Sequence, residues 1–482
     1  HGCQSIRIYP NLSQQLISMA APHVLALPFP AQGHVIPLME LSHRLVQHGV
    51  KVAFVNTELN HALILGALVS KDGSSRLGGV DMVSIPDGLG DGEDRKNLAR
   101  LAEAFSEVMP GELEKLMGRV SDSSVSAGGE ELTWMIADAS MAWAFPVARR
   151  LGLRVAAFNP SSVAMFAMRM SIPELIRDGV VDEKGLPKRR GTFRLAPAML
   201  PLDTTELSWN RAGDPKGQPV ILDLILRNNA ATHLAEAVVI SSVQELEPGA
   251  FALFPEVLTV GPLVSAEYKP AGSFWAEDDS CAAWLDAQPA GSVVYVAFGS
   301  FAIFDRAQLV ELAEALALTS RPFLWVVRPD SASEQWLEDL RCRAGPRGRI
   351  VSWCPQQLVL AHASTACFLS HCGWNSTMEG LVNGLTFLCW PYFTDQFLNR
   401  SYICDVWQTG LQVAPPPANA GEAVRTVERE VIRGKIEDLL GDEEIKVRAL
   451  ALRDVAQRAV GDDGSSRRNL TRFVDLVRGS AS

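Results

Sequence analysis

The sequence predicts an α/β protein built from two parallel sheets, each covered by helices on both faces. Three observations support this prediction. Short apolar segments recur along the chain, turns rich in Gly, Pro or polar residues follow them, and longer amphipathic segments fill the intervals. This alternation is typical of strand–helix units on parallel sheets. Gly and Pro interrupt the pattern between Val260 and Ser273, so we place the junction of the two sheets there.

The predicted strands form two sets, one on each side of that junction, and each strand is a short apolar run. The first set is Val24–Pro30, Lys51–Thr57, Asp81–Pro86, Thr133–Ala137, Arg154–Phe158 and Ala237–Ser241. The second set is Ser292–Gly299, Phe323–Val327, Arg349–Ser352, Ala366–Leu369 and Thr386–Trp390. Helical periodicity fills most of the gaps, for example in Pro37–His48, Ala307–Thr319 and Val427–Leu440.

Some segments depart from this pattern. Residues 1–18 differ in character from the rest of the chain and lack the basic-then-apolar order of a secretory signal, so we interpret them as an extension. Residues 178–217, which contain Trp209, are rich in Pro, Gly and charge, and a loop of that length is usually functional or mobile. Residues 415–417 form a turn or short linker, and the chain after Thr426 is charged and helical in pattern.

The composition narrows the class of protein. Of the 482 residues, 47% are apolar and 21% are charged, which is typical of globular chains and excludes intrinsic disorder. The 44 basic and 55 acidic residues give a net charge of −11 without a basic stripe, so we expect no nucleic-acid partner. No window holds the roughly 18–20 apolar residues that a membrane span needs. The eight cysteines form no Cys-x-x-Cys pair, which favours thiols in a reducing compartment.

A strand-to-helix transition around His371 is the most informative segment. The strand ends in this histidine, Gly373 allows a tight turn, and polar residues open a helix. Ligands bind beyond the carboxyl ends of parallel strands, and the free N–H groups of a helix N-terminus suit a phosphate. His371, Asn375 and Ser376 can add donors to a diphosphate there. Two alternatives stay open: Ser376 and Glu379 match a capping box, and His371 can be a structural histidine.

Other phosphate and metal motifs are missing from the sequence. No Gly-Lys-Ser/Thr follows this segment, and no G-x-G-x-x-G lies between a strand and a helix. Both facts argue against a P-loop and against a nicotinamide-dependent oxidoreductase. No Asp-x-Asp stands where it could hold a divalent ion, and we interpret Asp278-Asp279 and Asp462-Asp463 as solvated pairs. We therefore expect neither a metal nor another cofactor.

Trp353 opens a stretch of 44 residues that closes with Asp395 and Gln396. The stretch has Cys-Pro-Gln after the Trp, His in the nineteenth place, the run Gly-Trp-Asn-Ser, and Glu in the twenty-seventh place. With these features it resembles the donor-binding box of plant family-1 UDP-glycosyltransferases. Further segments resemble this family at Pro28–His34, Glu245–Glu247, Val260–Pro262 and Val294–Ser300. The resemblance implies the GT-B fold, in which two Rossmann-like doubly wound domains face each other across a cleft.

The resemblance also implies a role for each matched residue. Trp353 would stack on uracil, the main chain of Cys354 would read the uracil edge, and the ribose hydroxyls would bind Gln356 and Glu379. The implied residues at the diphosphate are Ser300, His371, Gly373, Asn375 and Ser376, and those at the sugar are Trp374, Asp395 and Gln396. A closing Gln resembles users of UDP-glucose, and no Arg replaces Trp374, which argues against a uronic-acid donor. The alternatives are a core role for Trp353 and a surface-turn role for Asp395.

His34 and Asp138 each follow a predicted strand of the first sheet, so both are expected at its carboxyl edge. A histidine suits the removal of a hydroxyl proton because its pKa lies near the working pH. An aspartate bonded to one ring nitrogen fixes the tautomer and stabilises the imidazolium. In the family, the corresponding His is the base and the corresponding Asp is its partner. The alternatives are a loop histidine and a helix-capping aspartate.

These inferences predict an inverting, metal-independent transfer of glucose from UDP-glucose to a hydroxyl of a small, largely apolar plant metabolite or xenobiotic. We expect an acceptor-binding domain at 19–262, a UDP-sugar-binding domain at 263–460, and a helix at 461–482 that packs back on the first domain. The acceptor pocket is expected from the segment around Trp209 and from the loops after Asn56, Ile85, Asp138 and Phe158. We also expect a cytoplasmic monomer that binds only a UDP-sugar and a small acceptor. The alternative is a non-catalytic UDP-sugar-binding protein, which would lack His34 or Asp138.

Overall fold

The structure of the protein is a computed structural model. It describes residues 21–68, 76–90, 92–126, 132–212, 215–264, 272–302, 304–413 and 426–479. The expected extension at 1–18, the turn at 415–417 and residues 265–271 of the expected junction lie outside the described residues. Within the described ranges, none of the helices combines the length and the apolar character that crossing a bilayer requires.

The first sheet has eight strands in the order β10-β9-β6-β5-β1-β2-β4-β3. Neighbouring strands are parallel except β3 and β4. Successive side chains point to opposite faces, so Val24 and Phe54 belong to one core and Leu25 and Val55 to the other. The strands are β1 (His23–Leu27), β2 (Lys51–Thr57), β3 (Arg76–Leu77), β4 (Val80–Ile85), β5 (Leu132–Asp138), β6 (Arg154–Asn159), β9 (Ala237–Ile240) and β10 (Leu258–Thr259).

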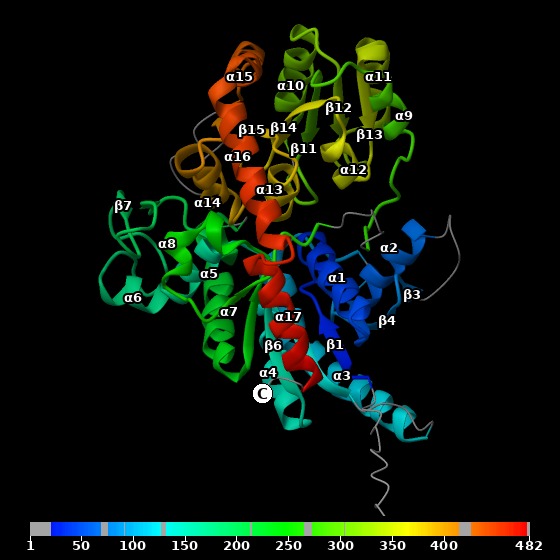
Figure 1. Cartoon of the computed structure of the whole chain (residues 1–482), viewed down its shortest axis with the longest axis vertical. Coiled ribbons are helices and arrows are strands. Elements are labelled where there is room, and N and C mark those ends of the chain that lie inside the picture. Colours follow the sequence, from blue (N-terminus) through cyan, green and yellow to red (C-terminus); the bar gives the residue numbers. More distant parts are fainter. Residues whose placement is uncertain are drawn as a thin grey trace, which may run out of the picture.

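Helices connect these strands and cover both faces of the sheet (Figure 1). They are α1 (Gln32–Gln47), α2 (Glu58–Leu68), α3 (Leu98–Ser126), α4 (Ala144–Arg150), α5 (Val163–Met170), α6 (Ile172–Arg177), α7 (Gln218–Ala231) and α8 (Pro248–Phe251). The predicted helix at Pro37–His48 begins earlier, at Gln32, because α1 accommodates Pro37 in its second turn.

The second sheet has six parallel strands in the order β13-β12-β11-β14-β15-β16. Its strands are β11 (Val293–Ala297), β12 (Phe323–Val326), β13 (Gly348–Val351), β14 (Thr365–Ser370), β15 (Thr386–Cys389) and β16 (Gly410–Gln412). Its helices are α9 (Cys281–Asp286), α10 (Arg306–Leu318), α11 (Glu334–Ala344), α12 (Gln356–Ala361), α13 (Trp374–Leu381), α14 (Gln396–Ser401), α15 (Arg429–Gly441) and α16 (Glu443–Val460). Two doubly wound, Rossmann-like units are therefore confirmed.

Every predicted strand is present, and its ends differ from the prediction by at most three residues. The structure also contains strands of only two or three residues that were not predicted. Most of them lie at sheet edges, such as β3, β10 and β16. Runs that short carry no apolar periodicity, so the sequence could not reveal them.

The segment 178–217 is largely exposed in its first half and buried around Trp209, between residues 207 and 211. It contains a two-stranded sheet of β7 (Thr192–Phe193) and β8 (Leu202–Asp203). Trp209 is fully buried, and its indole N–H donates to the carbonyl of Gly185 at 2.8 Å. Trp209 and Tyr295 of the second sheet belong to one hydrophobic cluster, so this segment joins the two halves.

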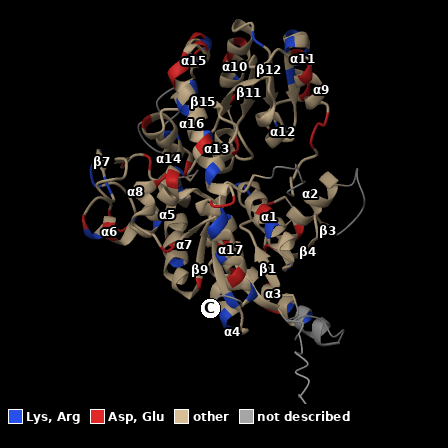
Figure 2. Cartoon of the chain, in the orientation of Figure 1, with Lys and Arg blue, Asp and Glu red and all other residues tan. Residues whose placement is uncertain are grey.

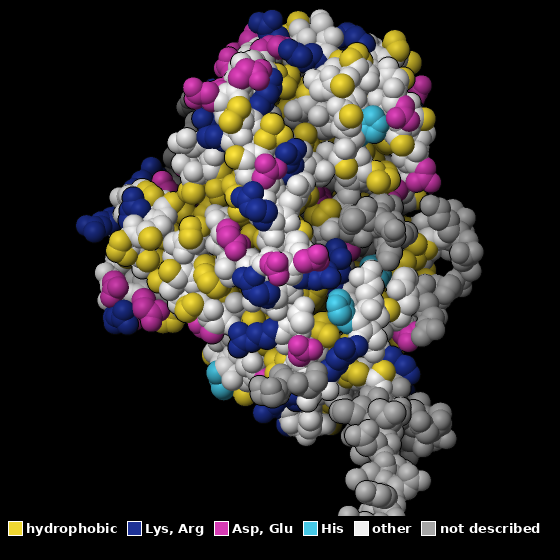
Figure 3. Space-filling model, viewed as in Figure 1, with side chains coloured by type: hydrophobic (Ala, Val, Ile, Leu, Met, Phe, Trp, Pro, Cys, Tyr) yellow, Lys and Arg dark blue, Asp and Glu magenta, His cyan; other side chains and the backbone are white. Residues whose placement is uncertain are grey.

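The last helix, α17 (Ser465–Arg478), runs along the first sheet (Figure 1). Phe473, Val474 and Val477 pack into the same core as Val24 of β1. The expected domain boundaries at 262 and 460 stay predictions. Charges of both signs are interspersed over the face seen in Figures 2 and 3, and no basic stripe crosses that face.

Candidate active site

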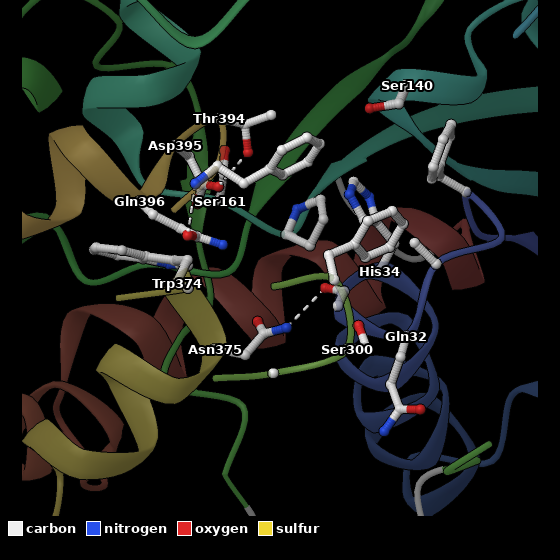
Figure 4. A pocket seen from close by; sticks show the side chains of 18 of the residues that line it. Gln32, His34, Ser140, Ser161, Ser300, Trp374, Asn375, Thr394, Asp395 and Gln396 are labelled. Atoms are coloured by element: carbon white, nitrogen blue, oxygen red, sulfur yellow. Dashed lines mark hydrogen bonds between the residues drawn. The ribbon is translucent and has the colours of Figure 1, made fainter. Parts of the chain in front are cut away.

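A cavity of about 330 Å³ lies between the two sheets, and both halves of the chain line it (Figure 4). Parallel strands explain this convergence, because β1, β5 and β6 of one sheet and β11 and β14 of the other end there. The predicted site residues that line it are His34, Ser300, Trp353, Cys354, Gln356, His371, Gly373, Trp374, Asn375, Ser376, Glu379, Asp395 and Gln396. Asp138 is fully buried behind His34.

His34 lies in the first turn of α1, and its Nδ1 is 2.7 Å from Oδ2 of Asp138 at the end of β5. The other carboxylate oxygen of Asp138 accepts the N–H of Ser140 at 2.7 Å, so the helix-capping alternative describes that oxygen correctly. An ionised carboxylate only accepts, so Nδ1 carries the proton and Nε2 keeps the lone pair. The His34 side chain is 29% exposed, which leaves this nitrogen accessible from the cavity.

His371 directly follows β14 (Thr365–Ser370), and two glycines lie close to its Nε2. A Cβ atom added at Gly299 or Gly373 would come within 2.5 Å of that nitrogen. Gly373 has an ordinary φ of −59°, whereas the positive φ of this turn, 64°, belongs to Cys372. The prediction that Gly373 allows the tight turn is therefore wrong, and the glycine is needed because the imidazole leaves no room for a side chain.

Burial lowers the pKa of His371 to about 4, so its ring is neutral near pH 7. Its Nδ1 has no hydrogen-bond partner among the described residues. One ring nitrogen thus lacks a partner, while a hydrogen bond to the backbone of Ala297 opposes the lowering of the pKa, so the alternative of a structural histidine stays open.

The helix after this turn, α13, has Gly373 as its N-cap, and within the described part of the chain no side chain bonds to its first N–H groups. Ser376 lies inside the first turn, so the capping-box alternative for Ser376 and Glu379 is wrong. The hydroxyl of Ser376 instead accepts the Nε2 amide of Gln356 at 2.9 Å. The first turn of α13 therefore presents unpaired N–H groups at the cavity, which suits an anion.

Asn375 contacts the opposite half of the molecule. Its Nδ2 donates to the carbonyl of Gly33 at 2.7 Å, as the dashed line beside His34 in Figure 4 shows. Gly33 would normally bond the N–H four residues later in α1, but Pro37 has none. The carbonyl freed by Pro37 thus accepts a hydrogen bond from the donor box, next to His34.

Trp374 also joins the two halves. Its indole N–H donates to the carbonyl of Ser241 at 2.7 Å, and only 3% of the residue is exposed. It reaches the cavity wall, but its polar atom is already used in this contact between the halves.

The expected nucleoside end contains two aromatic rings and a hydrogen-bonded network. Trp353 is half-buried, and its ring lies 4.7 Å from that of Trp275 between centroids. The hydroxyl of Tyr295 donates to Gln356 at 3.0 Å, and the Gln356 amide donates to Glu379 at 2.6 Å. Burial raises the pKa of Glu379 to about 7 against the opposing effect of this amide.

The expected sugar end is formed by the chain before α14. The Oε1 of Gln396 accepts the N–H groups of Tyr392 and Phe393 at 2.8 and 2.9 Å. These bonds fix the amide so that its nitrogen points into the cavity (Figure 4). Asp395 accepts hydrogen bonds from Thr394 and Asn399, and it lines the cavity, so it is not a simple surface-turn residue.

The acceptor side differs in part from the prediction. The chain after Asp138 and Phe158 and the surroundings of Trp209 line the cavity, but no described residue between 57 and 97 does, so the loops after Asn56 and Ile85 were wrongly included. The structure adds Gln32, which lies within the segment Pro28–His34 but was given no role, and residues that no motif marked, among them Arg169, Ile221, Leu224, Ile225 and Asn228. Gln32 lies two residues before His34 and was within reach of sequence reasoning, whereas an amphipathic helix such as α7 gives no sign of which face meets a ligand.

Among the described residues, no group of three or more His, Cys, Asp or Glu side chains is arranged to hold a metal ion. The seven described cysteines are free thiols.

Comparison with known proteins agrees with this geometry. A family model described as "UDP-glucoronosyl and UDP-glucosyl transferase" matches residues 232–435. The chain is 38% identical to UDP-glycosyltransferase 83A1 of Arabidopsis thaliana, over 95% of this chain and 97% of that protein. It is 31% identical to a 7-deoxyloganetic acid glucosyltransferase of Catharanthus roseus, over 95% and 98% of the two chains.

A solved structure shows the same architecture. A UDP-glucosyltransferase from Polygonum tinctorium, described as capable of glucosylating indoxyl, matches with a TM-score of 0.79 and 28% identity, over 96% of this chain and 99% of that one. The fold is thus that of a GT-B glycosyltransferase. The chain belongs to the plant UDP-glycosyltransferases.

Proposed function

We propose that this enzyme transfers glucose from UDP-glucose to a hydroxyl of a small, largely apolar acceptor, with inversion at the anomeric carbon. The observation that carries the proposal is the His34–Asp138 pair, joined at 2.7 Å, which opens into the same cavity as the donor box. The relatives support the donor, since two of those named above are described as glucosyltransferases.

The donor would lie along the second sheet. Uracil would rest against Trp353, the ribose hydroxyls would bind Glu379 and Gln356, and the diphosphate would lie at the first turn of α13 beside His371 and Ser300. The amide nitrogen of Gln396 and the carboxylate of Asp395 would bind the glucose hydroxyls. Trp374 and Asn375 would act mainly by holding the two halves together at this site.

The acceptor would lie along the first sheet, where the cavity wall is largely apolar. Leu98, Phe166 and three aliphatic residues of α7 (Ile221, Leu224 and Ile225) form that wall. Such a lining favours a small apolar aglycone with a polar edge.

In the proposed reaction, Nε2 of His34 takes the acceptor proton as the oxygen attacks the anomeric carbon. Asp138 stabilises the imidazolium that forms. UDP leaves from the opposite face of the sugar, so the configuration inverts. The charge that develops on UDP would be met by the N–H groups of α13 and by the N–H of neutral His371, and we propose that the reaction needs no metal.

A coupled assay of UDP release tests this proposal. Purified protein, UDP-glucose and a panel of phenols and terpenoid alcohols should yield UDP and a glucoside detected by mass spectrometry, with equal rates before and after chelation. Loss of activity on chelation that added Mg²⁺ restores would refute the metal-free step. UDP-glucose binding without turnover on any acceptor would favour the alternative of a non-catalytic UDP-sugar-binding protein, although that alternative leaves the intact His34–Asp138 pair unexplained.

Replacing Gln396 with His is expected to weaken discrimination between UDP-glucose and UDP-galactose. One imidazole nitrogen cannot accept the N–H groups of both Tyr392 and Phe393, so the chain before α14 is expected to move. The side-chain nitrogen that donates to the sugar would then leave its position. We expect kcat/KM for UDP-glucose to fall about 10- to 100-fold, the usual range for one lost hydrogen bond to a substrate together with an unpaired group. The ratio of kcat/KM for the two donors is the readout, and an unchanged ratio would remove Gln396 from sugar recognition.

UDP-glucose is expected to bind more tightly as the pH rises from 6 to 8. Glu379 has its pKa raised to about 7, so it is mostly protonated at pH 6 and mostly ionised at pH 8. Two ribose hydroxyls donate best to a carboxylate, so binding releases a proton, and affinity should rise about tenfold over this interval. The diphosphate of UDP-glucose is a diester and does not titrate in this range.

Calorimetry in two buffers of different ionisation enthalpy measures both the affinity and the proton released. In Glu379→Gln the pH dependence should vanish. If the wild-type affinity is flat between pH 6 and 8, Glu379 does not bind the ribose as a carboxylate. The monomeric state and the cytoplasmic location stay predictions.

A further inference from the structure

Arg169 is a cation in the cavity wall that the proposed reaction does not use. It lies in the last turn of α5 and lines the cavity. Among the described residues that line the cavity, it is the only Lys or Arg. A negative charge on the acceptor could therefore pair with a Lys or Arg side chain of the described cavity wall only at Arg169.

The backbone that carries Arg169 is firmly held. The carboxylate of Glu247 accepts the N–H groups of Val163 and Ala164 at the start of α5, both at 2.9 Å. At the other end, Nδ2 of Asn229 donates to the carbonyl of Arg169 at 2.7 Å. Hydrogen bonds thus hold α5 at both ends, so the backbone position from which the Arg169 side chain extends is fixed.

The guanidinium itself has no partner. It makes no hydrogen bond or ion pair with any described residue, and its Nε is buried without an acceptor. Burial lowers its pKa, against the opposing charges of Asp395 and Asp138. A partly buried cation without a partner is costly, so such a group is normally matched by an anion.

The two nearby acids do not supply that anion. Asp138 already accepts from His34 and from the N–H of Ser140. Asp395 already accepts from Thr394 and Asn399. Arg169 lies within ion-pair distance of no described carboxylate. The N–H donors of its guanidinium therefore remain available to a ligand in the cavity.

We propose that Arg169 binds a carboxylate of the acceptor, so that the preferred acceptors are hydroxy acids whose hydroxyl meets His34. A planar guanidinium pairs with a carboxylate through two parallel hydrogen bonds, which fixes orientation as well as charge. The remaining wall around it, with Phe166 and Ile225, suits an apolar spacer between the two polar ends. This inference rests on the proposed function and narrows its acceptor class.

The test compares acceptors that differ only in charge. p-Hydroxybenzoic acid and p-coumaric acid are each paired with their methyl ester and their amide. The variants are Arg169→Met, which keeps the length without the charge, and Arg169→Lys, which keeps the charge without the fork. Arg227→Met is the matched control, because Arg227 lies on α7 with 58% of its side chain exposed and pairs there with Asp223.

In wild-type protein, kcat/KM for at least one acid should exceed that for its ester. In Arg169→Met we expect the KM of that acid to rise about 30- to 100-fold, the range for a lost charge-assisted pair, while the ester changes less than about threefold. Arg169→Lys should fall between these values, and Arg227→Met should match wild type. Equal losses for acid and ester would show a structural role and overturn the proposal, as would a wild-type preference for every ester.

Further measurements separate this proposal from two alternatives, in which Arg169 binds the donor sugar or the acceptor carboxylate itself is glucosylated. If Arg169→Met changes the choice between UDP-glucose and UDP-glucuronate but not between acid and ester, the carboxylate belongs to the donor, and the proposal is wrong. If the main product is an alkali-labile glucose ester, the acceptor carboxylate lies at His34 rather than at Arg169, and the proposal is wrong. Calorimetric titration of the UDP-loaded protein with each acid and ester judges Arg169 even if no turnover is found, since wild type should bind the acid and Arg169→Met should not.

Discussion

Replacing His34 with Ala is expected to reduce kcat by about a hundred- to ten-thousand-fold while the affinity for UDP stays nearly unchanged. The imidazole is the only described His side chain in the cavity that is paired with a carboxylate, and its Nε2 is accessible. A positioned general base contributes a factor of this size. Without it, a neutral hydroxyl must lose its proton to water.

The test needs an acceptor that does not require a base. p-Nitrophenol is largely ionised at mildly alkaline pH, so His34→Ala should regain much of its lost rate with p-nitrophenol but not with an aliphatic alcohol. His48→Ala is the matched control, because His48 follows α1 at its other end, outside the cavity, and its ring bonds the carbonyl of Arg44. Normal turnover of an alcohol by His34→Ala would remove this residue from the role of base, and a lost affinity for UDP would indicate misfolding instead.

The fold was predictable because each strand and each helix leaves a pattern of apolar residues within its own segment of the sequence. Each buried parallel strand is a run of apolar residues, and each helix repeats its apolar residues with its own period, so the order of elements follows from the sequence. The donor side was predictable for a related reason. Trp353 to Gln396 is one continuous segment, and the structure brings its marked residues to one cavity.

Contacts between the halves could not be predicted in the same way. Asn375 and Trp374 carry polar groups that the sequence associates with a ligand, yet both groups reach carbonyls of the other half, at Gly33 and Ser241. Those carbonyls are backbone atoms, which leave no trace in the side-chain pattern. The same limit applies to Gly373, whose φ is ordinary and whose lack of a side chain is explained only by the position of His371.

The acceptor side was the least predictable. Its wall comes from α7 and the end of α5, where a residue that faces the cavity has the same apolar or basic type as one that faces the core or solvent. Arg169 and Arg227 look alike in the sequence, but the structure places one in the cavity and pairs the other with Asp223 on the surface.

Asp138→Asn is expected to lower kcat by about a thousand-fold or more, although it changes a single atom. Oδ1 of Asp138 is held by the N–H of Ser140 at 2.7 Å, and an asparagine that keeps this bond must turn its NH₂ toward His34. That NH₂ can only donate, so Nδ1 of His34 becomes the acceptor and the proton moves to Nε2. The nitrogen that faces the substrate then has no lone pair for the acceptor proton.

A change of tautomer and a loss of structure differ in their measurable effects. Asp138→Asn should unfold at nearly the wild-type temperature and bind UDP normally, and p-nitrophenol should restore turnover as it does for His34→Ala. Asp87→Asn is the matched control, because Asp87 is another buried aspartate just beyond a strand of the same sheet, paired with Arg95 and outside the cavity. Combining His34→Ala with Asp138→Asn should cost little more than His34→Ala alone, since Asp138 acts through the imidazole. A fully additive loss would mean that Asp138 contributes to turnover by some route other than His34.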